Sequence, residues 1–352
     1  MRTFMVSCIL LAAVTGAGTD ATAAQVAVKT TSAQPPRKVI VGTVLQPFWG
    51  AYPGLEKRLE QLAGIVDRLA GESGKKYGRG LDVAVLPEVA VTGELQGDLV
   101  AQAVPFAGLV EKTFARKACE HRCYIVVPMY LLEDKEKKLV SNVGILVGRQ
   151  GEVVGVYRKL HLAVPAGRDS MEGGVTPGKQ APVFQCDFGK LGIQICFDMS
   201  YDYGWRELAR AGADLVAWPT QSPQTARPAF RAMQGRYYIV SSTWRNNASV
   251  FEPTGRITAQ IKEPEQVLVQ ELDLSYALLP WSRNLANGEA LRKIYGQRVG
   301  FRYYPDEDLG IFWSNDPQVP IGRMVQTIGV AELEWELPRI QRLYQKAGVP
   351  GS

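Results

Sequence analysis

The fold of this chain is decided by the stretch Lys190-Leu191-Gly192-Ile193-Gln194-Ile195-Cys196-Phe197-Asp198-Met199-Ser200-Tyr201. Its first half is short, apolar and β-favouring, and the residues after Cys196 turn polar at once, which is typical of a strand that ends in a turn. A helical pattern then covers residues 205–213, and Pro219 stops a second buried strand that begins at Leu215. Ligands and reactive groups gather at the carboxyl ends of strands in α/β sheets. The sequence therefore predicts that Cys196 is a nucleophile.

Strand and helix patterns alternate on both sides of this stretch. Buried strands are predicted at 39–44, 81–86, 124–128, 237–243 and 267–272. Helices are predicted at 54–70, with Gly71 ending the helix before a polar loop at 72–80, and at 108–120. Gly-containing turns at 149–152 and 252–255 predict two β-hairpins. This pattern indicates an α/β fold with a mixed sheet, in one domain that spans residues 38–284.

The N-terminus predicts export from the cytoplasm. Arg2 precedes an apolar stretch and then small residues, which is the order of a secretory signal peptide over residues 1–24, with cleavage after Ala23 or Ala24. The alternative is an ordinary buried helix, which fits the uncapped, Thr-rich sequence that follows less well. Residues 25–37 are rich in Thr, Ala and Pro and predict a linker. We therefore expect a periplasmic or extracellular protein.

The composition of the chain limits the kinds of binding partner that we expect for this protein. Hydrophobic residues make up 46% of the 352 residues and charged residues 21%, which is a globular balance, and the net charge is only +5. Basic residues are not interleaved with aromatic ones, so we expect no nucleic-acid partner. No stretch outside the signal reaches about 18 apolar residues, so we expect no membrane span. His121 and His161 are the two histidines and neither has a metal-ligand spacing, so no metal or other cofactor is expected.

Four cysteines follow the signal peptide: Cys119, Cys123, Cys186 and Cys196. One catalytic thiol would leave an odd number, which argues against a full disulfide framework. Cys119 and Cys123 could form a bridge in an oxidising compartment or remain two reduced thiols, and the sequence leaves both open.

Three polar residues fall at strand ends: Glu88, Lys159 and Cys196. Each has an ordinary explanation, as a surface carboxylate, a solvated lysine or a core cysteine. Together they form a catalytic set, because a thiol needs a base and its tetrahedral intermediate needs a cation. Glu88 could remove the thiol proton. Lys159 could stabilise the oxyanion, aided by the backbone N–H of Phe197.

The remaining candidate site residues are weaker. His161 lies two residues past Lys159 and would face the same side of a strand, and we expect it to support the site by packing rather than to act as the base. Trp218 and Thr220 follow the strand next to Cys196 and are predicted to line the substrate pocket.

Three segments resemble the signature motifs of the nitrilase superfamily of carbon–nitrogen hydrolases, in that family's order. They are Leu86-Pro87-Glu88-Val89-Ala90-Val91-Thr92-Gly93, Tyr157-Arg158-Lys159-Leu160-His161-Leu162 and Gly192-Ile193-Gln194-Ile195-Cys196-Phe197-Asp198. Asn142 and Gly151 ahead of the lysine strand are similar as well. The resemblance covers residues 38 to about 275.

The resemblance implies an αββα sandwich, the four-layer type of the superfamily, whose subunits usually form a homodimer or a higher homo-oligomer. It also implies a triad with Glu88 as base, Lys159 at the oxyanion and Cys196 as nucleophile. Many members use a second glutamate between the lysine and the cysteine, and Glu172 is the one glutamate there. Residues 285–352 extend beyond this domain and are expected to pack on the core or on a dimer partner, with a helix at 331–346.

The expected function is a secreted, thiol-dependent amidohydrolase that cleaves a non-peptide amide or N-carbamoyl bond of a small molecule. Cys196-Phe197-Asp198 is similar to the Cys-Tyr-Asp of amidase-type members, whereas nitrilases commonly show Cys-Trp-Glu. Three alternatives remain. The same acyl-enzyme could pass its acyl group to an amine, the substrate could be a nitrile, or the chain could be a binding protein without turnover.

Overall fold

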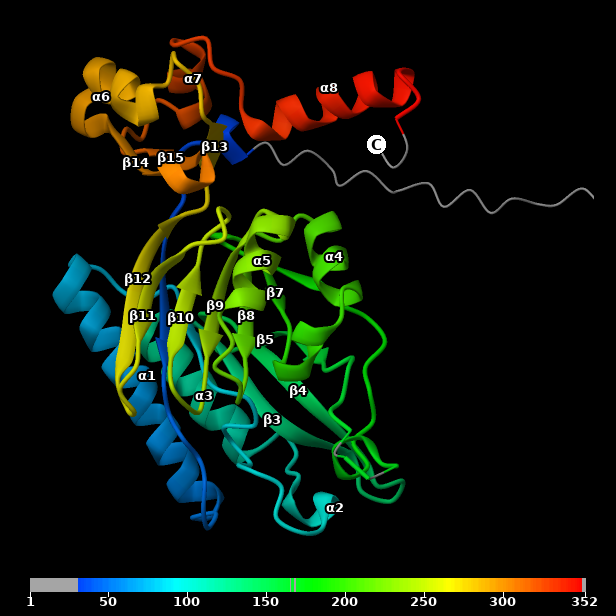
Figure 1. Ribbon diagram of the computed structural model, residues 1–352. Coiled ribbons are helices and arrows are strands. Elements are labelled where there is room, and N and C mark those ends of the chain that lie inside the picture. The colour runs from blue at the N-terminus through cyan, green and yellow to red at the C-terminus, as the bar shows by residue number, and fades with distance from the viewer. Residues whose placement is uncertain (1–30, 165, 168, 350–352) are drawn as a thin grey trace, which may run out of the picture.

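The computed structural model describes residues 31–164, 166–167 and 169–349. The expected signal peptide at 1–24, and the expected linker as far as residue 30, lie outside these residues. Most of the described chain forms two facing six-stranded sheets with helices on both outer sides, and a smaller unit sits at one end of them (Figure 1).

The first sheet has the strand order β12-β1-β2-β3-β4-β5. Its strands are β1 (Lys38–Val44), β2 (Val83–Val85), β3 (Tyr124–Asp134), β4 (Leu139–Val147), β5 (Val153–Arg158) and β12 (Val267–Asp273). β1, β2 and β3 are parallel, with Val41 beside Val83 and Val83 beside Tyr124. Their carboxyl ends therefore meet at one edge, where Glu88 follows β2.

The second sheet has the strand order β11-β10-β9-β8-β7-β6. Its strands are β6 (Val183–Cys186), β7 (Gly189–Ile193), β8 (Leu215–Pro219), β9 (Tyr238–Ser242), β10 (Ala248–Phe251) and β11 (Ile257–Ile261). β7, β8 and β9 are parallel, with Leu191 beside Leu215 and Leu215 beside Tyr238. Cys196 follows β7 at their carboxyl end.

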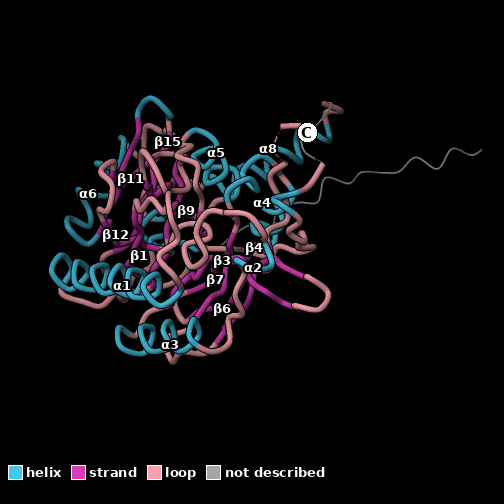
Figure 2. Tube along the Cα trace, turned by 90° about the horizontal axis from the view of Figure 1, so that it is seen from below, coloured by secondary structure: helices cyan, strands magenta, loops and turns pink. Residues whose placement is uncertain are grey.

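Four helices cover the outer faces of the two sheets. α1 (Leu55–Tyr77) and α3 (Leu109–His121) pack on the first sheet, and α4 (Tyr203–Arg210) and α5 (Ala226–Gly235) pack on the second. Alternate residues such as Val41, Val83, Ile193 and Ala217 fill a separate apolar layer between the sheets. Figure 2 shows α1 and α3 together on one side of the strands. The expected αββα sandwich is confirmed.

Helix α1 is longer than the sequence indicated. It continues through Gly71 to Tyr77 and ends at Gly78, whose backbone φ of 67° is left-handed, so the loop expected at 72–80 is wrong. A glycine inside a helix costs about 1 kcal/mol relative to alanine, which burial of the following turn can offset. Ser73 is fully buried, and the Tyr77 hydroxyl accepts a hydrogen bond from the Glu271 amide (3.1 Å).

The C-terminal unit has its own sheet and its own apolar core. Strands β13 (Tyr276–Pro280), β15 (Leu309–Ser314) and β14 (Val299–Tyr304) pair in that order, and α6 (Glu289–Tyr295) and α7 (Ile321–Gln326) pack around Leu279 and Phe312. Arg302 of this unit contacts the buried carboxylate of Glu252 next to β10 (Nε to Oε2 2.9 Å). β13 lies within the domain predicted at 38–284, and its Tyr276 and Leu278 also pack in the core between the two large sheets.

Residues 31–33, the described start of the expected linker, pack on this unit as the 3-10 turn η1 (Thr31–Ala33). The Thr31 hydroxyl donates to the Tyr276 carbonyl (2.9 Å), and Ser32 is buried. The other short helices are α2 (Leu99–Gln102), η2 (Met171–Gly173), η3 (Cys196–Ser200), η4 (Ala286–Gly288), η5 (Gly296–Arg298) and η6 (Pro305–Glu307).

The last helix, α8 (Leu333–Lys346), matches the helix predicted at 331–346. None of its residues is buried, and Trp335, Leu337, Leu343 and Tyr344 expose about half of their surface (54%, 47%, 53% and 52%). In Figure 1 it extends away from the C-terminal unit, on the side of α4 and α5. Among the described residues, none of the helices is both long and apolar enough to cross a membrane.

Candidate active site

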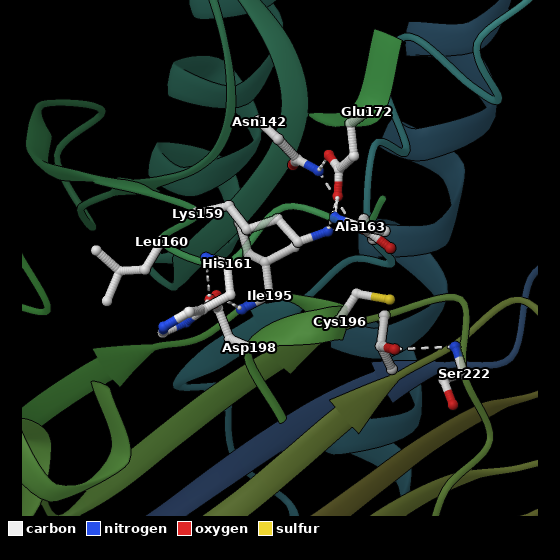
Figure 3. Close-up of polar contacts among 12 residues, drawn as sticks. Asn142, Lys159, Leu160, His161, Ala163, Glu172, Ile195, Cys196, Asp198 and Ser222 are labelled. Atoms are coloured by element: carbon white, nitrogen blue, oxygen red, sulfur yellow. Dashed lines mark hydrogen bonds and ion pairs between the residues drawn. The ribbon is translucent and has the colours of Figure 1, made fainter. Parts of the chain in front are cut away.

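Glu88, Lys159 and Glu172 converge at the carboxyl edge of the sheets. Figure 3 shows Lys159 near Glu172 and Asn142. The Lys159 ammonium donates to Glu88 Oε1 (2.8 Å) and to Glu172 Oε1. The Asn142 amide Nδ2 lies 3.1 Å from both Glu88 Oε1 and Glu172 Oε2. Glu88 and Lys159 expose only 2% and 1% of their surface. One buried cation is thus shared between two carboxylates.

The turn after β2 holds Glu88 through its own backbone carbonyls. Trp244 Nε1 donates to the Glu88 carbonyl (2.9 Å), and Arg58 Nη1 donates to the Ala90 carbonyl (2.9 Å). The Tyr52 hydroxyl donates to the Val91 carbonyl (3.0 Å). These donors come from two separate parts of the chain, the region at the start of α1 and the segment after β9. Each satisfies a carbonyl that the turn leaves unpaired, so the position of Glu88 is fixed from outside the site.

Lys159 and Glu172 are held by the neighbouring hairpin and loop. The Lys159 amide donates to the Asn142 carbonyl (2.8 Å), which continues the β4–β5 pairing by one residue. Glu172 lies in η2, within the loop that follows β5. The Ala163 amide donates to Glu172 Oε1 (3.0 Å), and the Glu172 amide donates to the Ala163 carbonyl (2.9 Å).

Cys196 is the first residue of η3 and has a left-handed backbone φ of 41°. A non-glycine residue in a sparsely populated conformation costs about 1–3 kcal/mol and persists only where its surroundings hold it. Trp218 Nε1 donates to the Cys196 carbonyl (3.3 Å). Glu88, Thr220 and Gln221 lie near enough to the thiol to shift its pKa. The sharp turn therefore places the thiol near the predicted base.

The electrostatics of the site keep the resting thiol neutral. Burial, and then the charge of Glu88, raise the pKa of Cys196 to about 12, although Lys159, Gln221 and Thr220 act in the opposite direction. Burial, helped by the charge of Glu172, also raises the pKa of Glu88 despite the lowering effect of Lys159. Burial alone would lower the pKa of Lys159, but the charges of Glu88, Cys196 and Glu172 outweigh it and raise that pKa well above its ordinary value. Lys159 is therefore a permanent cation next to a thiol and its base.

The weaker candidates occupy different places. Phe197 follows Cys196 in η3, so its amide is one residue past the nucleophile, and its ring contacts Tyr201 edge-on (5.7 Å between centroids). Trp218 is fully buried and supports the Cys196 carbonyl. Thr220 is fully buried and lies near enough to the thiol to lower its pKa. His161 stacks on Tyr201 (4.0 Å between centroids) and does not contact the triad directly.

Sequence reasoning assigned no role to Asn142, Tyr157 or Asp198, yet all three touch the site or the segments that carry it. Asn142 could have been found from the hairpin, because Val143 pairs with Arg158 and Asn142 must then face Lys159. Asp198 stands two residues after the nucleophile in an otherwise apolar stretch, and a carboxylate there needs partners when it is buried.

One other cluster has the composition of a metal site. Asp67, Glu120 and His121 bring ligand atoms within 4.8 Å of one another. The Lys117 ammonium already lies 2.7 Å from Asp67 and 3.0 Å from Glu120. This cation neutralises the two carboxylates, so we assign no metal to the cluster. Cys119 and Cys123 are both free thiols, the first exposed and the second buried.

The chain was compared with known proteins. Its residues 47–278 match the carbon-nitrogen hydrolase family. It is 26% identical over 214 residues to a probable nitrilase of Schizosaccharomyces pombe, a match that covers 56% of this chain and 77% of that one. It is 26% identical over 165 residues to the human deaminated glutathione amidase, covering 40% of this chain and only 50% of that one.

A solved structure shares the fold. Nit3 of Saccharomyces cerevisiae, a member of branch 10 of the nitrilase superfamily, superimposes with a TM-score of 0.57 at 20% identity. The superposition covers 67% of this chain and 90% of Nit3, so the two proteins share the fold over that part. Because the family match spans well over half of the chain, this protein belongs to the carbon–nitrogen hydrolase family, within the nitrilase superfamily.

Proposed function

We propose that this protein hydrolyses a linear amide or N-carbamoyl bond of a small molecule through a thioester on Cys196. The observation that carries the proposal is the shared cation. Lys159 contacts both Glu88 and Glu172, and the charges of Glu88 and Lys159 both act on the nearby thiol of Cys196. A binding protein has no need of a buried cation, a base and a thiol on a left-handed turn placed together.

The geometry supports the following sequence of bonds. Cys196 Sγ attacks the carbonyl carbon while Glu88 takes the thiol proton, and the oxyanion is stabilised by Lys159 and the Phe197 amide. The C–N bond then breaks, and Glu88 returns the proton to the departing nitrogen, which leaves as ammonia or an amine. Water attacks the thioester as Glu88 takes its proton. Release of the acid restores the thiol.

The second carboxylate has a role of its own in this scheme. Glu172 hydrogen-bonds Lys159, Asn142 and the Ala163 amide, so it orients the cation rather than the substrate. Its negative charge also raises the pKa of Glu88. A base with a raised pKa is better matched to reversible proton transfer near neutral pH.

An amide is favoured over a nitrile by the Phe197-Asp198 sequence after the nucleophile. The name of the human relative, deaminated glutathione amidase, agrees with an amide substrate. Acyl transfer to an amine uses the same acyl-enzyme, and no contact in the described residues favours it over hydrolysis.

The test is ammonia and acid release from a panel of amides, N-carbamoyl compounds and nitriles, with Cys196→Ala and Cys186→Ala as matched variants. We expect turnover of an amide or carbamoyl compound that Cys196→Ala abolishes and Cys186→Ala retains. Intact-protein mass spectrometry should trap the acyl group on Cys196. No thioester, together with alkylation of Cys196 no faster than that of Cys186, would contradict the proposal. An N-acylated product formed only with added amine would establish the transferase instead.

We also infer that two copies of this chain associate through α8. A 14-residue helix with no buried residue is not stable alone in water, so its exposed Trp335, Leu337, Leu343 and Tyr344 need a cover. Phe230 and Met233 of α5 are also exposed (51% and 39%), and α5 lies on the same side of the molecule as α8 in Figure 1, so a two-fold axis could pair the two helices. Light scattering should give a dimer or larger assembly for the native chain and a monomer for Leu343→Glu. Lys346→Glu is the control.

Export remains part of the proposal because it rests on the first 24 residues. N-terminal sequencing of the protein from its native cell should give a start near Gln25. A mature protein that begins at Met1 would overturn export and leave the proposed chemistry unaffected.

A further inference from the structure

Asp198 is a fully buried carboxylate that accepts four hydrogen bonds. Its donors are the Ile195 amide (2.9 Å), the Tyr157 hydroxyl (2.7 Å), the His161 amide (2.8 Å) and His161 Nδ1 (3.0 Å). Figure 3 shows Asp198 between the His161 and Ile195 backbones, below Lys159. Removing a carboxylate from water is costly unless its oxygens are paired, and here they are fully used.

The donors come from the two segments that carry the nucleophile and the cation. Ile195 immediately precedes Cys196, whereas Tyr157 and His161 lie two residues before and two residues after Lys159. One carboxylate therefore ties the end of β7 to the end of β5. These strands belong to different sheets, so no backbone ladder fixes the distance between them.

The phenol keeps its proton in this arrangement. Burial and then the charge of Asp198 raise the pKa of Tyr157 well above its usual value, so its hydroxyl is a permanent donor. His161 is held against Tyr201 by ring stacking, which leaves Nδ1 directed at Asp198. We call Asp198 and its donors the clamp. None of these donors takes part in the proposed proton transfers.

We propose that Asp198 is a positioning residue that fixes the Cys196 thiol relative to Lys159 and holds the left-handed turn at Cys196. This role rests on the proposed thiol chemistry. Asp198 contacts neither Glu88 nor Lys159 in the described structure, so it acts through the two segments. A displacement of about 1 Å in a reacting group can cost about 10²-fold in rate.

The experiment compares Asp198→Asn with the wild-type full chain. The substitution keeps the volume of the side chain but places an amide donor where an acceptor stood, so a backbone N–H of Ile195 or His161 loses its partner. We expect kcat to fall about 10²-fold with KM changed less than about threefold. The rate of Cys196 alkylation by iodoacetamide, measured per folded molecule, should change as well.

Asp273→Asn is the matched control. Asp273 is also a buried carboxylate (5% exposed) that accepts backbone N–H bonds, from Arg37 (3.0 Å) and Ser275 (2.8 Å). It pairs with Lys38 at the first residue of β1, the opposite end of that strand from the site. We expect a lower melting temperature with unchanged kcat and unchanged alkylation of Cys196. A purely structural role for Asp198 predicts this same result for Asp198→Asn, and that outcome would overturn the proposal.

Tyr157→Phe keeps the inference testable if Asp198→Asn does not fold. It removes one donor and keeps the carboxylate, so we expect a smaller fall in kcat, again without a matching rise in KM. Where both variants fold, the double variant should lose less activity than the two single losses combined. The reason is that Asp198→Asn has already removed the carboxylate that the Tyr157 hydroxyl bonds. Full additivity would contradict the clamp. Failure of the proposed function itself would show separately, as a wild-type protein without turnover or thioester.

Discussion

At the scale of single residues, the pH dependence of the enzyme follows from the charge that Glu172 places next to Glu88. Glu88 must be ionised to act as a base, and burial and Glu172 raise its pKa above the ordinary glutamate value. Activity should therefore be lost as pH falls through this raised pKa. Glu172→Gln removes one raising charge, so the acid limb of kcat/KM should move to lower pH. Profiles of the two proteins on one substrate would check this, and a shift to higher pH would contradict it.

The thiol of Cys196 should also titrate unusually. Its pKa is raised to about 12 by burial and by Glu88, so its alkylation should still be accelerating at pH 10. A free cysteine, with a pKa of about 8.5, would have levelled off by then. Glu88→Gln should abolish turnover but move the alkylation curve to lower pH, because the repelling charge is gone. An unchanged curve in this variant would show that Glu88 does not control the thiol.

The sequence predicted the reacting groups better than it predicted the residues that hold them in position. Glu88, Lys159 and Cys196 each follow a strand, and strand ends can be read from apolar runs. Asp198 could not be assigned a role in the same way, because Tyr157 lies on β5 of the other sheet and His161 follows that strand. Local patterns contain no information on which sheet edges face each other.

At the scale of elements, substitutions at two glycines can test the stability of the last turns of helix α1. Gly71 lies inside the helix, and a Cβ added there would meet no atom within 4 Å. Gly71→Ala should therefore stabilise the protein by about 0.5–1 kcal/mol. Gly78→Ala is the counterpart, since the left-handed φ of 67° at this position disfavours any side chain and should lower stability. Urea unfolding of both variants would measure the two signs.

The same helix shows why some boundaries were missed. The sequence pattern placed the end of α1 at Gly71 because glycine often ends helices, yet the contacts of Ser73 and Tyr77 carry the helix further. Strands β14 and β15 were not foreseen either. β14 pairs with β15, and β15 also pairs with β13, so this sheet depends on contacts between segments that are separated in the chain.

At the scale of the whole molecule, a buried ion pair is one of the contacts that join the C-terminal unit to the second sheet. Glu252 is fully buried, and Arg302 contacts its Oε2 through two nitrogens. Arg302→Ala would leave a buried charge without its cation, and we expect a loss of about 3 kcal/mol. Arg292→Ala is the control, because its partner Glu289 is exposed and such pairs contribute less than about 1 kcal/mol. Thermal unfolding would compare them, and equal losses would contradict the expectation.

The turn η1 joins residues that precede β1 to the C-terminal unit. Thr31 bonds to Tyr276, 245 positions further along the chain, and Ser32 packs beside Gly322 of α7. Residues that precede β1 in the chain therefore complete the packing of the C-terminal unit. A cut or deletion just before β1 would act on the opposite end of the chain, loosening the C-terminal unit while the catalytic sandwich stays closed. Removing residues 31–33 would thus change the packing of the C-terminal unit.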